Sequence, residues 1–525
     1  SGAVTNASVI TLSIDVDETP TGFAASDVLY SSAGDGTGTF GALTATGSSP
    51  EYTITFTPDS SDTYTFSVAG GAFTDAVGNN NDASNNFEWQ YDGTVPTVTG
   101  VIVAGGDDNY KEDEDVTIEV TFSEAVNVTD TPTLALNTNA TASYTDGDGT
   151  ATLTFTYTVG EGQNTSDLDY AATTSLSGTI KDLYGNDANL TLASPGAEGS
   201  ISQGGDVVID TTAPIVSEEV AVSTPSNNVT PSLTINSNEV GAISASNTLT
   251  GDVTAEVGNN TITFDTLDAG SYDSATVTVT DAAGNETTIT LTTFVIDTTS
   301  PAAFQSTTVV STGGTVVSTY YNSTNTAVSV TTPIADDDTL VGGTLQIQAK
   351  VGDGDYADIG SAATISSANT TQAISLSASD VEALANFAED VVLYFRAIIT
   401  DSAGNATTGT ASATTLTVDQ AAPEVSAFSM NDTSLITGDT ATVTLTFSEA
   451  VTGFASEDIT APSGSLGTMT SADDAGVEWT GTFTPSANTS DSSNTLSLAT
   501  TYTDVAGNPG PTATTANYVV DTAAN

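Results

Sequence analysis

Apolar and polar residues alternate along short runs throughout this chain of 525 residues. Val116, Ile118, Val120 and Phe122 occupy every second position of one such run. A period of two places successive side chains on opposite faces of a strand, so each run predicts a β-strand with one buried face. Comparable runs include Ile10, Leu12 and Ile14; Tyr64, Phe66 and Val68; Ala275, Val277 and Val279; and Leu393, Phe395, Ala397 and Ile399. About seven such strands per hundred residues, separated by Gly, Asn and Asp turns, predict antiparallel β-sandwiches with Greek-key connections.

Two short motifs return in the same order along the chain. The first is Asp-x-x-Gly-Asn, which begins at Asp75, Asp182, Asp281, Asp401 and Asp504. After one more strand-like run comes an aspartate that opens a short link rich in Thr, Ala and Pro; these link aspartates are Asp92, Asp210, Asp297, Asp419 and Asp521. Recurrence at roughly hundred-residue spacing indicates tandem modules. The predicted fold is therefore all-β, with five sandwiches in an extended row: residues 1–94, 95–212, 213–299, 300–421 and 422–525.

Single modules depart from the common pattern. We expect module one to be shortened, because the segment before Asp17 is about ten residues shorter than the matching segment of module five and is expected to lack a first strand and an incoming link aspartate. Module two contains a Gly/Ser-rich insertion, predicted to be a surface loop. Module three carries Tyr272 behind a glycine turn, which predicts a tyrosine corner or an ordinary core tyrosine. Module four holds the one helix expected, over residues 379–385, where a capping residue precedes good helix formers.

The charge balance changes the picture of possible partners. Asp and Glu number 66 against 4 Lys and Arg, giving a net charge of −62 without any histidine. Such a surface repels nucleic acid and anionic membranes and favours cations. The absence of Cys and His removes disulfides, thiolate nucleophiles, the usual general base and the usual zinc ligands. No run of about 20 apolar residues is present, so we expect no membrane insertion within this chain.

Three acidic positions are expected to meet at each joint between modules. In a sandwich of this kind, the incoming link lies beside two loops of the next module. One loop carries the Glu of Phe-Ser-Glu-Ala-Val or its counterpart, and the other carries the Asp of Asp-x-x-Gly-Asn. The four predicted groups are Asp92, Glu124 and Asp182; Asp210, Glu239 and Asp281; Asp297, Asp401 and part of Asp336, Asp337 and Asp338; and Asp419, Glu449 and Asp504.

Calcium is the ion that such groups fit best. Three unpaired carboxylates repel one another, and a divalent cation removes the repulsion. Ca²⁺ accepts six to eight oxygen ligands in loose geometry, whereas Mg²⁺ demands a strict octahedron and zinc prefers nitrogen and sulfur. The alternative interpretation is that Asp-x-x-Gly-Asn is only a turn, in which Asp caps the bend and Gly and Asn adopt the left-handed conformation. The two interpretations are compatible.

With these motifs in view, the chain resembles the tandem bacterial Ig-like modules of large prokaryotic surface proteins, such as adhesin stalks and Ig-built surface layers. The resemblance is carried by the turn motifs, the Asp-Thr-Thr-x-Pro links and Phe-Ser-Glu-Ala-Val at Phe122 and Phe447. The stretch at 21–28 also matches the stretch at 452–459 closely. The resemblance implies secreted, non-catalytic, Ig-like sandwiches that calcium stiffens at the joints.

The shortened first module suggests a partner for this chain. A sandwich without an edge strand offers unpaired backbone to another chain. We therefore hypothesise head-to-tail or lateral self-assembly, in which the region of Asp521 completes the open joint at Asp17, Glu18 and Asp75 of the next molecule. The competing explanation is that the sequence is a piece of a longer polypeptide.

The function expected is structural rather than enzymatic. We expect an extracellular, cell-surface rod with bound Ca²⁺, in a surface layer, sheath, filament or adhesin stalk. The main alternative is a carbohydrate- or protein-binding adhesin module, for which module four and its adjacent Tyr320 and Tyr321 are the candidates, although ordinary strand packing is the favoured interpretation of this pair. A glycosidase is a third possibility, but no carboxylate pair stands out for that chemistry. The acidity also fits adaptation to a saline habitat without any ordered metal.

Overall fold

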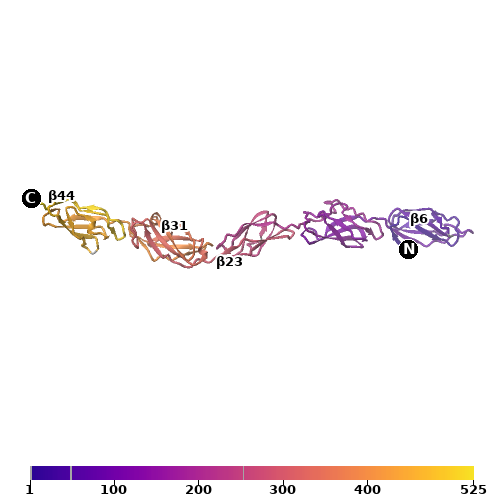
Figure 1. Cartoon of the computed structure of the whole chain (residues 1–525). Coiled ribbons are helices and arrows are strands. Elements are labelled where there is room, and N and C mark those ends of the chain that lie inside the picture. Colours follow the sequence, from indigo (N-terminus) through magenta and orange to yellow (C-terminus); the bar gives the residue numbers. More distant parts are fainter. Residues whose placement is uncertain (1–2, 48–49, 252, 474, 525) are drawn as a thin grey trace. The chain divides into compact units, whose positions relative to one another are not determined.

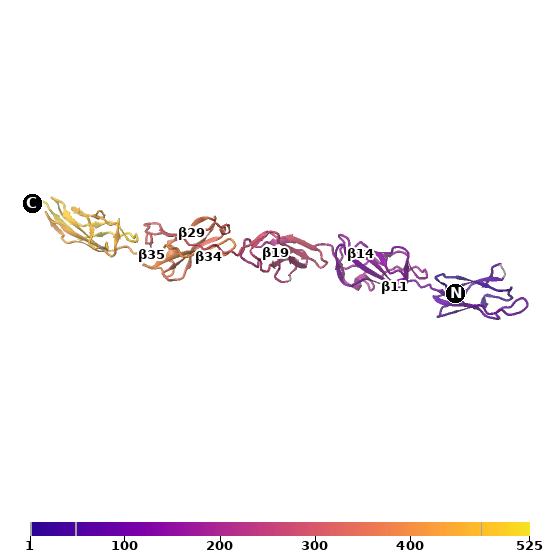
Figure 2. The ribbon, with the colours of Figure 1, turned by 90° about the horizontal axis from the view of Figure 1, so that it is seen from below.

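The computed structural model describes residues 3–47, 50–251, 253–473 and 475–524. The fold is all-β, a series of Ig-like sandwiches, and each described sheet draws its strands from one predicted module, so that each group of strands spans one stretch of the colour bar (Figures 1 and 2). The chain divides into two compact units. Unit 1 comprises Ser1–Val220, Leu233–Ile262 and Ala275–Leu291, and unit 2 comprises Ala221–Ser232, Thr263–Ser274 and Thr292–Asn525.

Module one, in unit 1, is built from two facing sheets. Their strands are β1 Ala3–Thr5, β2 Ile10–Asp15, β3 Val28–Ser32, β4 Gly38–Phe40, β5 Thr44–Ala45, β6 Glu51–Pro58, β7 Asp62–Val68 and β8 Phe87–Tyr91, with a 3-10 turn at Ala25–Asp27. One sheet has the order β1-β8-β7-β3, and the other has β2-β6-β4 with β5 beside β6. The alternating residues of β7 are buried as the pattern predicts, and Phe56, Tyr64 and Trp89 form an aromatic core.

Among the residues that the structure describes, strand β2 lies at the edge of its sheet. It pairs with β6 alone among the described residues, whereas its counterparts in later modules each lie between two strands. Leu12 is buried, but Ile10 and Ile14 in the same inward row are only half-buried. An edge strand with an incompletely covered apolar row is a site where another strand can add.

Module two, also in unit 1, is organised by the long strand β11. Its elements are β9 Val98–Val103, β10 Asp108–Tyr110, β11 Asp115–Val128, β12 Thr133–Ala135, β13 Thr141–Asp146, β14 Thr150–Thr158, β15 Leu176–Ser177, β16 Ile180–Asp182, α1 Ile201–Gly204 and β17 Val207–Ile209. β11 first pairs with β9 and β14. After a register shift between Thr121 and Val126 it pairs with β16. This bend brings the segment around Glu124 to the same end of the module as Asp182.

The insertion of module two is not the surface loop that we expected. Leu192 and Ile201 within it are buried in the module's core, and Ile201 opens the one-turn helix α1. The Gly and Ser content of the segment indicated its turns correctly. The two apolar anchors decide its packing, because burying a Leu or Ile side chain contributes about 1.5–3 kcal/mol. The expectation of a single helix in the chain was therefore wrong.

Module three contributes strands to both units. Apart from terminal residues, unit 1 holds β18 Val216–Val220, β19 Ser232–Ser237, β20 Gly241–Ala245, β21 Val253–Ala255, β22 Gly258–Thr263, β24 Thr276–Thr280 and β25 Glu286–Thr290, and unit 2 holds β23 Gly270–Tyr272 and β26 Phe294–Ile296. In unit 2 the Tyr272 hydroxyl donates to the carbonyl oxygen of Asp268 at 2.9 Å, four residues back, and the ring stacks on Phe294. The predicted tyrosine corner is confirmed.

Module four, in unit 2, contains the largest regular sheet of that unit. Its elements are β27 Thr308–Thr312, β28 Tyr320–Tyr321, β29 Ala327–Ile334, β30 Thr344–Val351, β31 Ala357–Thr364, β32 Thr370–Ser377, α2 Ala378–Glu382, β33 Val392–Thr400, β34 Ala406–Thr408 and β35 Leu416–Val418, with a 3-10 turn at Asp338–Leu340. The predicted helix is confirmed as the short α2, which Ser377 caps by accepting from the Asp380 amide. The alternating residues of β33, Leu393 to Ile399, are buried.

Module five, also in unit 2, is similar to module one but has more strands, among them one that covers the edge left open in module one. Its strands are β36 Val425–Met430, β37 Ser434–Ile436, β38 Ala441–Phe447, β39 Val451–Thr452, β40 Ile459–Thr460, β41 Gly464–Leu466, β42 Thr470–Ser471, β43 Glu478–Pro485, β44 Ser490–Asn494, β45 Ser497–Leu498, β46 Thr503–Asp504, β47 Ala513–Thr514 and β48 Tyr518–Asp521, with a 3-10 turn at Ser456–Asp458. β38 lies between β36 and β43. The strand β36 is the element that β2 lacks.

Candidate metal sites at the module joints

The Asp-x-x-Gly-Asn motif forms the same hydrogen-bonded turn wherever it occurs. In module two, Asp182 Oδ1 accepts from the amides of Tyr184 and Asn186, each at 2.8 Å, and Oδ2 accepts from Asn186 Nδ2 at 2.6 Å. Gly185 has a φ of 101°, which a residue with a Cβ adopts only under strain. The other four motif glycines also have a positive φ, whereas the asparagines do not, so the left-handed position belongs to Gly alone. The turn interpretation is thus correct for the aspartate and the glycine.

The asparagine of the turn, which we call the turn asparagine, has a second role that sequence reasoning missed. Its Nδ2 also donates to the main-chain carbonyl of the link aspartate that enters from the preceding module. The four such bonds are Asn186 to Asp92 at 2.8 Å, Asn285 to Asp210 at 2.9 Å, Asn405 to Asp297 at 2.8 Å and Asn508 to Asp419 at 2.9 Å. One amide group thus ties the turn to the link. The invariant Asn of the repeat was the available signal.

A second clamp holds the link five residues further on. Ser123, directly before Glu124, donates its amide to the Thr97 carbonyl at 2.8 Å, and its Oγ accepts from the Thr97 amide at 3.1 Å. Ser448 makes the same exchange with Glu424. Asn238 replaces the serine in module three and exchanges bonds with Ile215. The link is therefore held at two points, at its aspartate and at the residue five positions later, which lies beside the serine or asparagine that precedes the glutamate.

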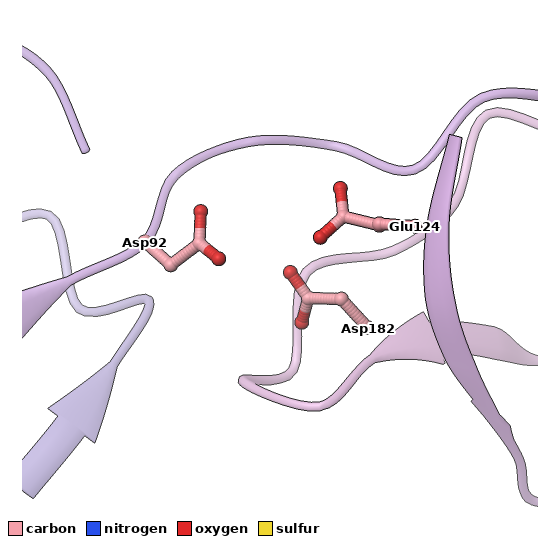
Figure 3. Close-up of side chains that lie close together, drawn as sticks. All are labelled: Asp92, Glu124 and Asp182. Carbon is pink, nitrogen blue, oxygen red and sulfur yellow. The ribbon is translucent and has the colours of Figure 1, made fainter. Parts of the chain in front are cut away.

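These two clamps bring three carboxylates together at three joints. Asp92, Glu124 and Asp182 each offer one oxygen, and these oxygens lie within 4.8 Å of one another. Figure 3 shows the three side chains pointing toward one another, with Asp92 on the link, Glu124 on the bent β11 and Asp182 at the end of β16. The same geometry is found for Asp210, Glu239 and Asp281, and for Asp419, Glu449 and Asp504. We call these clusters the first, second and fourth triads, after their joints.

The glutamates of the triads are electrostatically unfavourable in the absence of a cation. Burial, and then the negative charges of Asp92 and Asp182, raise the pKa of Glu124. The same causes raise the pKa of Glu239 and of Glu449. In the second triad, Glu239 Oε1 is buried without a hydrogen-bond donor. Such an oxygen lacks the partner that buried acceptors ordinarily have, and a cation would supply one.

The fourth triad is the most acidic. Glu389 and Asp390 of module four add negative charge around Glu449 and Asp419, and together with burial they raise the pKa of both carboxyls. Asp504 is 1% exposed, and its carboxylate accepts from the amides of Gly507 and Asn508. All side-chain atoms of the triads that could bind a metal ion are carboxylate oxygens, the ligands that hard cations such as Ca²⁺ prefer.

Comparison with known proteins agrees with this organisation. Residues 2–91 and 419–520 match the bacterial Ig-like domain family. The two matched ranges correspond to the first and fifth modules. The chain is also similar to the crystal structure of domains A168-A170 from titin, at 11% identity over 62% of this chain and 99% of that one, with a TM-score of 0.24. No curated protein matches the chain significantly.

Bacterial Ig-like domains in tandem indicate an extracellular structural or adhesin-like protein at the cell surface. Families with the Ig-like fold are in general non-catalytic. No helix of the described residues is long and apolar enough to cross a membrane.

The third joint lacks a triad in the described residues. Asn405 ties the turn to Asp297 as elsewhere, but no third carboxylate joins Asp297 and Asp401. Asp336 follows β29 by two residues, as Glu239 follows β19 and Glu449 follows β38, yet its side chain is one methylene shorter and exposed. Of its neighbours, Asp337 caps the 3-10 turn by accepting from the Thr339 amide, and Asp338 is exposed within that turn.

Module one presents its acids separately. Asp17 and Glu18 are exposed, and Asp75 is bonded within its own turn to Val77 and Asn79. In module five, Asp521 is the exposed last residue of β48. Within one chain the described residues bring none of these four into a triad.

Of the aromatic pair considered for an adhesin site, Tyr321 lies in the core of module four. Tyr321 is fully buried, its hydroxyl donates to Glu382, and its ring packs against Phe387. Tyr320 is half-buried beside it on β28. The pair therefore serves strand packing and does not form an exposed aromatic rim.

Proposed function

We propose that this chain is a non-catalytic extracellular structural protein in which Ca²⁺ connects neighbouring Ig-like modules rigidly at three joints. The observation that supports the proposal is the recurrence of one triad geometry at three separate joints. Each triad combines a link aspartate of one module with a glutamate and an aspartate of the next. An ion bound there attaches both modules to one point and opposes bending at the link.

Hydrogen bonds within the protein position the carboxylates of each triad. The turn asparagine fixes the link at the level of its aspartate, and the serine clamp fixes it five residues later. The three carboxylates would hold the ion with oxygen ligands, and backbone carbonyls or water would complete the six to eight positions that Ca²⁺ takes. The role suits a surface layer, sheath, filament or adhesin stalk, where distance and stiffness matter more than a binding pocket.

Self-assembly is part of this proposal. The open edge of β2 supports addition of a strand, as β36 adds to β38 in module five. A strand supplied by a second molecule would run antiparallel to β2 and cover Ile10 and Ile14. The exposed Asp17 and Glu18 would then lie beside an incoming link, as Glu449 lies beside Asp419.

Calcium titration with the full chain tests the central proposal. We expect isothermal titration calorimetry to give three strong Ca²⁺ sites per chain, with weaker Mg²⁺ binding. Small-angle scattering of the same sample should show a narrower distribution of shapes with Ca²⁺ than with chelator. Weak, non-stoichiometric binding that vanishes in moderate salt would instead favour a merely salt-adapted surface.

A further inference from the structure

The chain contains only 4 basic residues, Lys111, Lys181, Lys350 and Arg396. Lys111 donates from Nζ to the Gly284 carbonyl at 2.9 Å, at the joint between modules two and three. Lys181 forms the one ion pair found among the described residues, with Asp187. Both cations are therefore engaged within the chain. Lys350 and Arg396 remain, and they lie together.

Lys350 and Arg396 share the outward face of the sheet in module four. The register of β30 and β33 pairs Gln348 with Arg396 and Lys350 with Tyr394. The inward residues of both strands are buried, so these side chains lie on the opposite face. Tyr356, from the turn before β31, completes the group; β31 is labelled in Figure 1.

The two cations are held by aromatic rings instead of carboxylates. The Arg396 guanidinium lies 4.0 Å from the Tyr356 ring centroid, and Lys350 Nζ lies 5.4 Å from Tyr356 and 5.1 Å from Tyr394. Arg396 Nε donates to Gln348 Oε1 at 2.8 Å. Cation–π contacts fix a cation without neutralising its charge. No acidic side chain within the described residues comes within 4.0 Å of either one as an ion-pair partner.

Acidic residues are close by without forming an ion pair with either cation: Asp358 accepts from Gln348 Nε2 at 2.9 Å, and Asp355 directly precedes Tyr356. The cations are ordered by tyrosines, half-buried, and retain their charge. A hollow at the end of β30, lined by Lys350, Asp355, Leu384 and Asn386, adjoins them. The face is thus prepared for an external carboxylate, which Arg binds through two parallel hydrogen bonds.

We propose that the face formed by Lys350, Tyr356, Tyr394 and Arg396 is a lateral docking surface for a second copy of this chain. We call it the cation–tyrosine face. The argument is charge complementarity: the chain's own surface is rich in exposed carboxylates, such as Asp17 with Glu18 and Glu112 with Asp113. Two copies repel one another over most of their surfaces. At the cation–tyrosine face a carboxylate of another copy meets two cations that form no ion pair among the described residues.

The ionic strength determines whether such a contact between two copies can form. The Debye length is about 8 Å at 0.15 M ionic strength, so repulsion between distant charges of two copies is largely screened. Contacts between groups in hydrogen-bonding distance are screened less. The inference extends the structural role proposed above, but it does not require calcium at the joints.

The test is sedimentation velocity of the full chain over a range of concentrations in 0.15 M NaCl, with and without Ca²⁺. We expect reversible self-association, and we expect the double substitution Lys350→Gln and Arg396→Gln to weaken it at least tenfold. Lys181→Gln, which removes a cation elsewhere, should associate as the unmodified chain does. Arg396→Lys keeps the positive charge and should retain part of the self-association. Thermal transitions monitored in parallel identify any variant that is misfolded.

Three results would overturn the inference. The unmodified chain could remain monomeric at every concentration, or the double variant could associate as strongly as the parent. Alternatively, the monomer could bind polygalacturonate through Lys350 and Arg396, which would make an acidic glycan the occupant of the face. Calcium stoichiometry is measured separately, so failure here and failure of the joint proposal are distinguishable.

Discussion

Replacing Glu239 by Gln is the most informative single change, because it should alter stability in opposite directions with and without calcium. Glu239 is the member of the second triad whose Oε1 is buried without a donor. Gln has nearly the same shape and no charge. Its amide can donate to Asp210 or Asp281, so the variant relieves repulsion without opening a cavity.

The magnitude follows from the triad's geometry. Two unit charges separated by 4.8 Å, the limit of the triad, repel by about 3.5 kcal/mol at an effective dielectric of about 20 and by about 1 kcal/mol in water. Glu239 takes part in two such pairs. Since the group is half-buried and solvent screens it, we take the lower end and expect the variant to gain about 2 kcal/mol in chelator.

Calcium should reverse the order. A ligand at 100 times its dissociation constant stabilises the folded state by about 2.7 kcal/mol. The parent gains this at the second joint, whereas the variant, with one ligand charge fewer, gains much less. Differential scanning calorimetry in EDTA and in CaCl₂ therefore gives a crossover, and titration calorimetry should show two strong sites in place of three.

Glu256→Gln is the matched control, since Glu256 belongs to the same module and is exposed. It should shift neither transition. If Glu239→Gln lowered the thermal transition in EDTA and left the calcium response intact, the carboxylates of the second triad would be neither in mutual repulsion nor ligands, and the joint argument would fail.

Three further outcomes are expected. In chelator, the thermal transition temperature should rise as the pH falls from 7 toward about 4.5, because the pKa values of Glu124, Glu239 and Glu449 are raised in the folded state and protonation therefore favours folding. In calcium, the transition temperature should fall over the same pH range, since protons displace the ion. Equal slopes with chelator and with calcium would contradict this expectation. Asn405→Ala should loosen the third joint by about 1–3 kcal/mol with or without calcium, seen as faster proteolysis within residues 297–301, while Asn79→Ala, whose amide bonds only within its own turn among the described residues, should leave every link protected. Tyr272→Phe should lower the free energy of unfolding by about 1 kcal/mol, measured by urea titration, through loss of the bond to Asp268.

The sequence was most reliable where a pattern repeats. Alternation in β11 and β33 predicted strands and their buried faces, since a period of two is a local property of the backbone. It was least reliable where one or two apolar residues decide packing. Leu192 and Ile201 anchor a segment that otherwise looks like a surface loop.

The triads show the same division. The recurring motifs predicted the members of the first, second and fourth triads by residue, because each member occupies a fixed place in the repeat. They also suggested a third, which the shorter and exposed Asp336 does not complete. The turn asparagine's bond to the link, and Ser123 clamping Thr97, depend on directions of donors that no spacing reveals.

What the sequence alone determined is the all-β class, the tandem repeat and the acids that belong together, since these depend on periodicity and on order along the chain. The tertiary structure decided which acids actually meet. It also placed Lys350 over the rings of both Tyr356 and Tyr394, which lie far apart in the sequence, and Arg396 over the ring of Tyr356. Strand register sets those distances, and register is settled by packing across the whole sandwich.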